Sequence, residues 1–306
     1  MSRATRVVLT GAAGQVGLDL LDTLRGLEVP GASRAYWADA RPVADGEFEV
    51  LGLTRHDVDM TSPELLRHAI EMTRPDVIVN LAAYTAVDRA ESDVATCRAV
   101  NDIAVGVLSE AAEAVDSHLI TLSTDYVFDG TKGAAYVEDD STGPLNVYGA
   151  TKLAGERRCS PLDTIVRTSW VMGVRGQNVL RAIARRAASG ERVRFVADQT
   201  GTVTTAADLA HALVALVRAR PGGTWHVANA GATTWFDVAA HAGACLGRAQ
   251  DFAEPIDTAE LSPVPAAQRP ARSDLSTERF TGAGYAAPPD WHDAVARLLA
   301  ARDASW

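Results

Sequence analysis

Residues 6–17 read RVVLTGAAGQVG, an apolar run followed directly by three glycines at every third position. The composition of residues 6–10 predicts a buried strand, and residues 18–24 continue as a helix. A strand, a glycine turn and a helix in this order form the phosphate-binding element of a Rossmann unit, where glycines allow a close backbone approach to a pyrophosphate. The spacing is G-x-x-G-x-x-G, so a purely structural turn is the alternative. The residues expected to bind a dinucleotide are Gly11, Gly14, Gln15, Val16 and Gly17.

Strands and helices continue to alternate beyond this element. Further buried strands are predicted at residues 75–83, 119–125 and 164–171, with helices at 61–73, 94–106 and 107–115. Repeated strand–helix alternation indicates an α/β fold with a Rossmann-type, doubly wound parallel sheet. The alternation loosens towards the C-terminus, which predicts a smaller substrate-binding cap there. We therefore expect residues 1–172 to form a dinucleotide-binding domain, with residues 203–230 returning to it, and residues 173–306 to serve mainly in substrate binding.

Composition and charge limit the partners of the chain. Its 306 residues are 47% hydrophobic and 22% charged, as in ordinary soluble globular proteins, and the formal net charge is −10. An acidic surface argues against nucleic acids and anionic membranes as partners, and no apolar run approaches the ~18 residues of a membrane span. The three cysteines, Cys97, Cys159 and Cys245, show neither a disulfide framework nor metal-ligand spacing. These features predict a cytoplasmic protein.

Tyr148 and Lys152 lie four residues apart in the stretch PLNVYGATK, residues 144–152. On a helix this spacing places both side chains on one face. A phenol with a pKa near ~10 is a weak proton donor at neutral pH, but a nearby ammonium favours the phenolate and eases proton exchange. Reduction of a ketone needs this chemistry, because hydride arrives from one side while a proton is delivered to the oxygen. A chance pair on an ordinary helix is the alternative.

Residues 26–48 leave the position of the second strand open. If an earlier segment that ends at Asp39 forms this strand, Asp39 would bind the ribose hydroxyls of the cofactor. If residues 49–53 form it, residues 26–48 are an insertion. Arg55 then follows the strand where the 2′-phosphate of NADPH needs a cation. We favour the second interpretation, in which the residues near the adenine are Asp59 and Met60.

Five stretches carry a resemblance to a known family. They are LTGAAGQVG at residues 9–17, PDVIVNLAAYTAVD at 75–88, STDYVFDG at 123–130, PLNVYGATKLAGE at 144–156 and RTSW at 167–170. With them, the chain resembles the dTDP-4-dehydrorhamnose reductase family of the extended short-chain dehydrogenase/reductase superfamily. The stretch STDYVF followed by Y-x-x-x-K is specific within the superfamily, whereas the glycine loop is not.

The resemblance implies a role for each matched residue. Tyr148 would be the proton donor, and Lys152 would hold the nicotinamide ribose and lower the pKa of Tyr148. Thr124 would hydrogen-bond the C4 oxygen of the substrate. Asp125 and Trp170 would line the sugar site, although Trp170 could instead be a core residue. The remaining contacts would be Asn178 to the diphosphate, unless it is only a helix cap, and Ala82, Ala83 and Tyr84 beside the cofactor.

Two departures from the family pattern affect the expected ligands. Thr54 stands where an acid is common, which favours NADPH over NADH as the cofactor. Some members bridge a dimer through a metal held by acidic side chains. Only Asp19 has a counterpart to these ligands here, so no metal is expected. A homodimer is compatible with the resemblance.

The resemblance predicts an NADPH-dependent oxidoreductase, with NADH as the alternative cofactor, that reduces the C4 ketone of a dTDP-4-keto-6-deoxysugar. The product would be dTDP-L-rhamnose or another dTDP-deoxysugar of antibiotic biosynthesis, as in streptose formation. A sugar-nucleotide epimerase or dehydratase is a rival, weakened because Tyr126 rather than a glutamate follows Asp125. A non-catalytic, nucleotide-binding regulatory subunit is a further alternative, against which the intact Thr124, Tyr148 and Lys152 argue.

Overall fold

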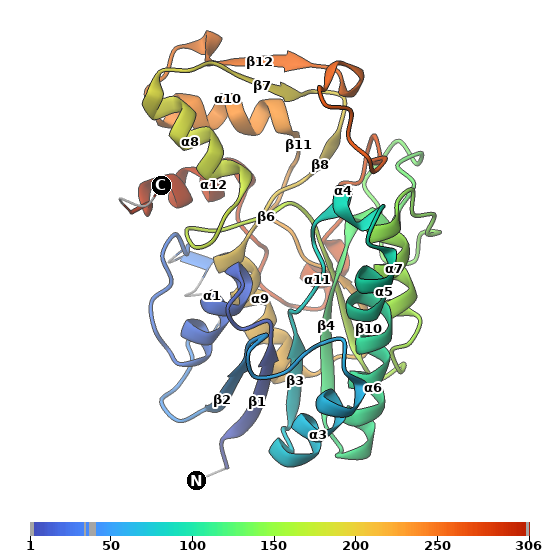
Figure 1. Cartoon of the computed structure of the whole chain (residues 1–306). Coiled ribbons are helices and arrows are strands. Elements are labelled where there is room, and N and C mark those ends of the chain that lie inside the picture. The colour runs from blue at the N-terminus through green and yellow to red at the C-terminus, as the bar shows by residue number, and fades with distance from the viewer. Residues whose placement is uncertain (1–2, 34, 37–40, 304–305) are drawn as a thin grey trace.

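The computed structural model describes residues 3–33, 35–36, 41–303 and 306, and a six-stranded parallel sheet forms its centre. The strand order is β10-β5-β4-β3-β1-β2, so the chain winds outward from β1 in both directions (Figure 1). The strands are β1 (Thr5–Thr10), β2 (Phe48–Leu53), β3 (Val77–Asn80), β4 (His118–Thr124), β5 (Thr164–Thr168) and β10 (Gly223–His226). This order confirms the expected doubly wound, Rossmann-type fold, whose ligands bind beyond the carboxyl ends of the strands.

Helices cover both faces of the sheet because successive side chains of its strands point to opposite faces. Val7 and Leu9 of β1 belong to the apolar core shared with α1 and α9, whereas Val8 packs with Leu66 and Ile70 of α3. Figure 1 shows α1 and α9 on one side of the sheet and α3, α6 and α7 on the other. The bounds of these helices are α1 (Gln15–Leu24), α9 (Ala206–Ala219), α3 (Pro63–Thr73), α6 (Ala104–Ala114) and α7 (Val147–Glu156).

A smaller layer, which we call the cap, lies over the carboxyl edge of the sheet (Figure 1). Leu180, Val238 and Leu298 belong to its own apolar core. Its helices are α8 (Val179–Ser189), α10 (Trp235–Cys245) and α12 (Trp291–Ala300), and its strands pair as β7 (Val193–Val196) with β12 (Ala253–Ile256) and β8 (Thr200–Thr202) with β11 (Ala232–Thr234). The chain passes between the two layers through β6 (Val171–Met172) and β9 (Thr204–Thr205), which pair with each other. The short helices are α4 (Val87–Ala90), α5 (Val94–Arg98) and α11 (Glu278–Gly282), with 3₁₀ turns at Asp125–Val127, Gln250–Phe252 and Thr258–Glu260.

β2 answers the question that residues 26–48 left open. Phe48–Leu53 pairs in parallel with the whole of β1, from Thr5↔Phe48 to Thr10↔Leu53. The second strand is therefore the later of the two candidates, and Arg55 follows its carboxyl end. Asp39 lies outside the described residues.

The expected division into helices at residues 94–106 and 107–115 is wrong. The chain runs from α5 through a π-helical turn (Ala99–Ile103) directly into α6. The Asn101 side chain inside this turn is buried, and it accepts a hydrogen bond from the Tyr84 N–H at 2.9 Å and donates one to the Tyr84 carbonyl at 3.0 Å. A π turn inside a helix is often found at a functional site, and here it supports the backbone of Tyr84.

The strand expected at residues 164–171 is broken near its end. β5 stops at Thr168, Trp170 has a φ of 44°, and β6 starts at Val171 and pairs with β9 instead of continuing in the sheet. A left-handed residue turns the chain away from its neighbours, which explains the break.

Gly155→Ala should lower the free energy of unfolding by about 1–3 kcal/mol, the usual cost of overpacking. A Cβ at this position of α7 would lie 2.2 Å from the carbonyl oxygen of Asn101, which belongs to backbone that cannot move aside cheaply. Urea unfolding followed by circular dichroism measures the change.

Gly282→Ala provides the matched control. This glycine also lies in a helix, α11, and apart from its chain neighbours and the backbone of that helix no described atom lies within 4 Å of where its Cβ would be. The variant should therefore unfold at nearly the wild-type urea concentration. Equal losses of stability in the two variants would contradict the packing argument for α7.

Candidate active site

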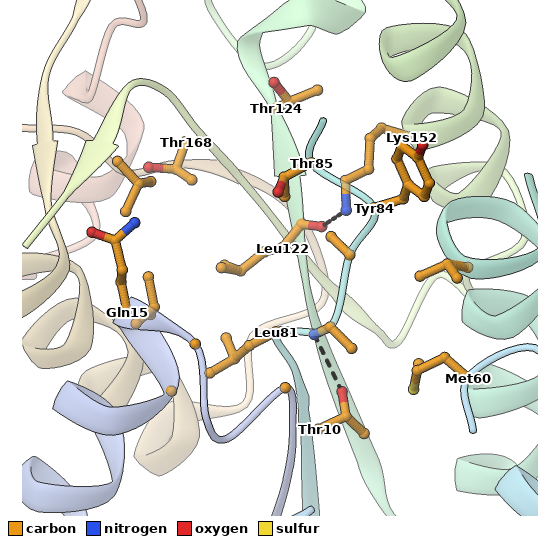
Figure 2. Close-up of a pocket in the computed structure, with 18 of the residues that line it drawn as sticks. Thr10, Gln15, Met60, Leu81, Tyr84, Thr85, Leu122, Thr124, Lys152 and Thr168 are labelled. Carbon is orange, nitrogen blue, oxygen red and sulfur yellow. Dashed lines mark hydrogen bonds between the residues drawn. The ribbon is translucent and has the colours of Figure 1, made fainter. Parts of the chain in front are cut away.

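A cavity of about 940 Å³ opens at the carboxyl edge of the sheet. It reaches from the turn after β1, past the ends of β2, β3 and β4, to the start of α7 and the segment after β5. Figure 2 shows Gln15 and Thr168 on one side of this cavity and Met60 and Tyr84 on the opposite side. Its volume is at the upper end of the range for ligand pockets, which suits a large ligand.

The turn after β1 requires glycine at two positions. Gly11 has a φ of 67°, and a Cβ there would lie 2.7 Å from the backbone nitrogen of Ala82. A Cβ at Gly17 would lie 2.4 Å from the Gly11 carbonyl oxygen. Gly14 caps α1 without a side-chain hydrogen bond, so the first N–H groups of the helix face the cavity without a protein cap. This cradle fits the pyrophosphate of a dinucleotide.

The predicted cofactor residues all line this one cavity. Arg55 is exposed at the end of β2, where Thr54 donates hydrogen bonds from its backbone and its hydroxyl to Asp57. At the end of the neighbouring strand β1, Thr10 Oγ1 accepts a hydrogen bond from the Ala82 N–H at 3.4 Å (Figure 2). The predicted residues lining the cavity are Gly11, Gly14, Gln15, Val16, Gly17, Arg55, Asp59, Met60, Ala82, Ala83 and Tyr84.

Tyr148 and Lys152 reach the cavity from the first turns of α7. Asn146 caps this helix by accepting a hydrogen bond from the Gly149 N–H at 2.8 Å, which fixes where the helix begins. Lys152 is 5% exposed, and its Nζ donates a hydrogen bond to the Leu122 carbonyl of β4 at 2.5 Å (Figure 2). The expected pair therefore lies on one helix, beside the central strand of the sheet.

Burial shifts the pKa of both groups. Desolvation lowers the pKa of Lys152 to about 8, against the opposing effect of the nearby Glu156 carboxylate. Desolvation raises the pKa of Tyr148, and the Thr124 hydroxyl within hydrogen-bonding reach opposes this rise. The phenol is thus kept protonated, and the expected lowering of the Tyr148 pKa by Lys152 is not found, because the Lys152 Nζ hydrogen-bonds the Leu122 carbonyl instead. The Lys152 ammonium can itself exchange its proton near neutral pH.

Asp125 lies next to this pair and is buried. Its carboxyl group accepts hydrogen bonds from the Thr124 hydroxyl at 3.0 Å and from the Ser273 hydroxyl at 2.6 Å. Desolvation nevertheless raises the pKa of Asp125 to about 7. Near neutral pH this group can therefore either donate or accept a hydrogen bond in the cavity.

Trp170 and Asn178, the two residues with competing interpretations, take different positions. Trp170 is partly exposed and lines the cavity, and it also packs against the apolar core of the cap. The Asn178 oxygen caps α8 through the Arg181 N–H, and its nitrogen donates to Gln15 Oε1 at 2.9 Å and to the Gly173 carbonyl. Asn178 is absent from the residues that line the cavity, so its contact with the cavity runs through Gln15.

Several lining residues were missed by the sequence analysis. Ser123 and Tyr126 lay inside the stretch STDYVF, which was used for the resemblance without giving them roles. Gly176 and Gln177 reach the cavity from the loop before α8, where the Gln15 side chain donates to the Gln177 carbonyl. The glycines at 173 and 176 before a helix cap were the available signal. The other missed residues include Thr168 and Ser169.

Neither a metal site nor a membrane-spanning helix is found among the described residues. No group of three or more His, Cys, Asp and Glu side chains in that part of the chain has an arrangement that could hold a metal ion. Asp19, the one candidate from the family pattern, lies 3.6 Å from the guanidinium of Arg175. None of the described helices is long and apolar enough to cross a membrane.

Known proteins resemble the chain over almost its whole length. The family model of the RmlD substrate binding domain matches residues 5–303. A dTDP-4-dehydrorhamnose reductase of Burkholderia thailandensis is 39% identical over 95% of this chain and 96% of its own. A dTDP-4-keto-6-deoxy-D-glucose reductase of Streptomyces niveus is 37% identical over 94% of this chain and 91% of its own.

A solved structure agrees with these sequence relatives. It is a dTDP-4-dehydrorhamnose reductase of Bacillus anthracis in complex with NADP, 30% identical, with a TM-score of 0.85 over 97% of this chain and 99% of the other. The likeness extends over the sheet, the cavity and the cap. The chain therefore belongs to the RmlD substrate binding domain family, which includes the dTDP-4-dehydrorhamnose reductases.

Proposed function

We propose that this protein is an NADPH-dependent oxidoreductase that reduces the C4 ketone of a dTDP-4-keto-6-deoxysugar, forming dTDP-L-rhamnose from dTDP-4-dehydrorhamnose. One observation carries this proposal: Thr124, Tyr148 and Lys152 line the same cavity as the glycine turn. A proton-donating pair and a dinucleotide cradle thus share one space. The relatives named as reductases of dTDP-4-keto sugars support the substrate, and the NADP complex of the Bacillus anthracis protein supports the cofactor.

In this reaction the bound nicotinamide supplies the hydride, and the chain supplies the proton. Tyr148 gives its phenolic proton to the C4 oxygen as that oxygen gains charge. The buried Lys152 ammonium stabilises the phenolate that Tyr148 becomes. Thr124, beside Tyr148, provides a second polar contact for the same oxygen. Together these groups favour the alkoxide-like transition state over the ketone.

The other predicted residues divide between the two ligands. Arg55 would contact the 2′-phosphate of NADPH beyond β2, with NADH as a weaker cofactor. Asp125 and Trp170 would contact the sugar, and Asn178 would act on the diphosphate through Gln15. Under this proposal residues 1–172 and 203–230 bind the cofactor, whereas residues 173–306 serve mainly the sugar nucleotide. A cytoplasmic location and a homodimer remain predictions.

A different dTDP-4-keto-6-deoxysugar is the second candidate substrate. The Streptomyces niveus relative, whose name specifies dTDP-4-keto-6-deoxy-D-glucose, is almost as similar to this chain as the Burkholderia thailandensis protein. The stereochemistry at C3 and C5 of the sugar separates the two substrates, whereas the chemistry at C4 is shared. A purely regulatory role is disfavoured because the proton-donating group is intact.

Assays with each of the two purified dTDP-4-keto sugars and NADPH test the proposed function. We expect one NADPH oxidised for each ketone reduced, with higher kcat/KM for dTDP-4-dehydrorhamnose than for dTDP-4-keto-6-deoxyglucose. Product identity is established by chromatography against authentic dTDP-L-rhamnose. NADPH binding without turnover of either sugar would overturn the proposal in favour of a regulatory subunit.

Tyr148→Phe should lower kcat by about 10²–10⁴-fold, the usual contribution of general acid catalysis, because only the donated proton is lost. The ring and its packing remain, so the KM values for both substrates should change little. Steady-state kinetics measure this effect. Wild-type turnover by the variant would exclude Tyr148 as the donor.

The kcat/KM for the sugar nucleotide should decrease as the pH rises above about 8, because the Lys152 ammonium has a pKa of about 8 and loses its proton there. The decline should approach about tenfold per pH unit, as for the loss of one essential proton. Rates are measured from about pH 6 to about pH 9.5, with thermal melting at each pH to confirm that the fold persists. A flat profile across this range would show that the charge on Lys152 is not needed.

Arg55→Ala should raise the KM for NADPH much more than the KM for NADH, because only NADPH carries the 2′-phosphate that a guanidinium can bind. The NADH measurement is the internal control for general damage to the site. If both KM values rise equally, or neither rises, Arg55 does not select the cofactor and Asp39 is the next residue to replace.

A further inference from the structure

Trp170 has a backbone conformation that its surroundings must maintain. Its φ of 44° is in the left-handed region, which is unfavourable for a residue with a bulky side chain. Such residues persist only where neighbouring contacts determine the conformation, and they gather at binding sites. Trp170 lies between the end of β5 and the start of β6, and its side chain lines the cavity. The contacts that hold this indole therefore control one wall of the site.

Two residues of the cap hold the Trp170 indole. Trp235 stacks on it with ring centroids 4.1 Å apart and an angle of 14° between the planes. A Cβ at Gly201 would lie 2.7 Å from Cε2 and Cζ2 of the same indole, so only glycine leaves room for it. Trp170 is thus fixed by a large aromatic partner and by a close backbone contact.

Both contacts come from one small ribbon. Gly201 lies in the middle of β8 and pairs with Thr233 of β11, and Trp235 follows β11 as the first residue of α10. Neither Gly201 nor Trp235 lines the cavity, whereas Trp170 does. A change in this ribbon would therefore reach this wall of the cavity through the Trp170 ring.

We propose that Trp235 is a positioning residue for the sugar nucleotide, acting through the stacked indole of Trp170. This inference rests on the proposed function, in which Trp170 packs against the deoxysugar. A flat apolar ring suits one face of a sugar ring and its C6 methyl group. Held in place by Trp235, that ring orients C4 towards the proton donor. A ring displaced by about 1 Å could lower the rate about 10²-fold.

Trp235→Ala should lower kcat/KM for the sugar nucleotide by about 10–100-fold and leave the KM for NADPH within about twofold of wild type. Trp235→Phe should recover most of the lost activity, because a phenyl ring still stacks on the indole. Trp235→Leu retains apolar volume without stacking, so it should behave like the alanine variant. It also covers the case in which the alanine variant does not fold.

Phe236→Ala is the matched control for loss of packing. Phe236 is the next residue of α10, is partly buried and packs against the same apolar core of the cap. Its replacement should lower the melting temperature without a selective effect on the sugar nucleotide. The two variants are compared by their fall in kcat/KM for the sugar nucleotide relative to their rise in KM for NADPH. If Phe236→Ala and Trp235→Leu give the same ratio, Trp235 is a structural residue only.

A double-mutant cycle decides whether Trp235 acts through Trp170. In a Trp170→Ala background, the further change Trp235→Leu should alter kcat/KM by less than about twofold, because contacting residues that work together are not additive. Full additivity would overturn the inference while the proposed function stands. Absence of turnover in the wild-type protein would instead overturn the proposed function, and this inference with it.

Discussion

The close approach of α7 to its neighbours is the constraint on which the rest of the site depends. A Cβ at Gly149 would lie 2.2 Å from the Tyr126 carbonyl oxygen, and a Cβ at Gly155 equally close to that of Asn101. With glycine at both points, the helix lies near enough for Lys152 to hydrogen-bond the Leu122 carbonyl of β4. Tyr148 then lies beside Thr124, the last residue of that strand. The proposed proton donor is therefore fixed by backbone packing rather than by flexible side chains.

Burial of charge gives the site its chemistry at a cost in stability. Lys152 has its pKa lowered by desolvation, and Asp125 has its pKa raised by the same effect. Behind Lys152, the buried Glu156 is held by Arg167 at 2.7 Å and by the Ser123 hydroxyl. Buried ion pairs of this kind seldom add net stability, because desolvation offsets the attraction between the charges. The Glu156 carboxylate also opposes the lowering of the Lys152 pKa, so this ion pair affects the electrostatics of the site.

The sequence predicted the parts of the structure that depend on local patterns. The buried parallel strands appear as continuous apolar runs such as that of β3, and the glycine turn at Gly11 comes directly after the first strand, where a dinucleotide cradle is expected. The π turn at Ala99–Ile103 was missed because residue propensities do not distinguish a hydrogen bond to the fifth residue from one to the fourth. The break after Thr168 was missed because nothing local predicts a left-handed tryptophan. Its support comes from Gly201 and Trp235, which are far away in the chain.

The central claim is that hydride and proton meet at C4 of the sugar in this one cavity. Reduction of the dTDP-4-keto-6-deoxysugar with NADPH that carries deuterium at both C4 positions of the nicotinamide tests it most directly. We expect the H4 signal of the sugar to be missing from the proton NMR spectrum of the product and a single deuterium signal at C4 in its deuterium NMR spectrum. Deuterium at another carbon, or a product formed with no transfer from the cofactor, would contradict the account.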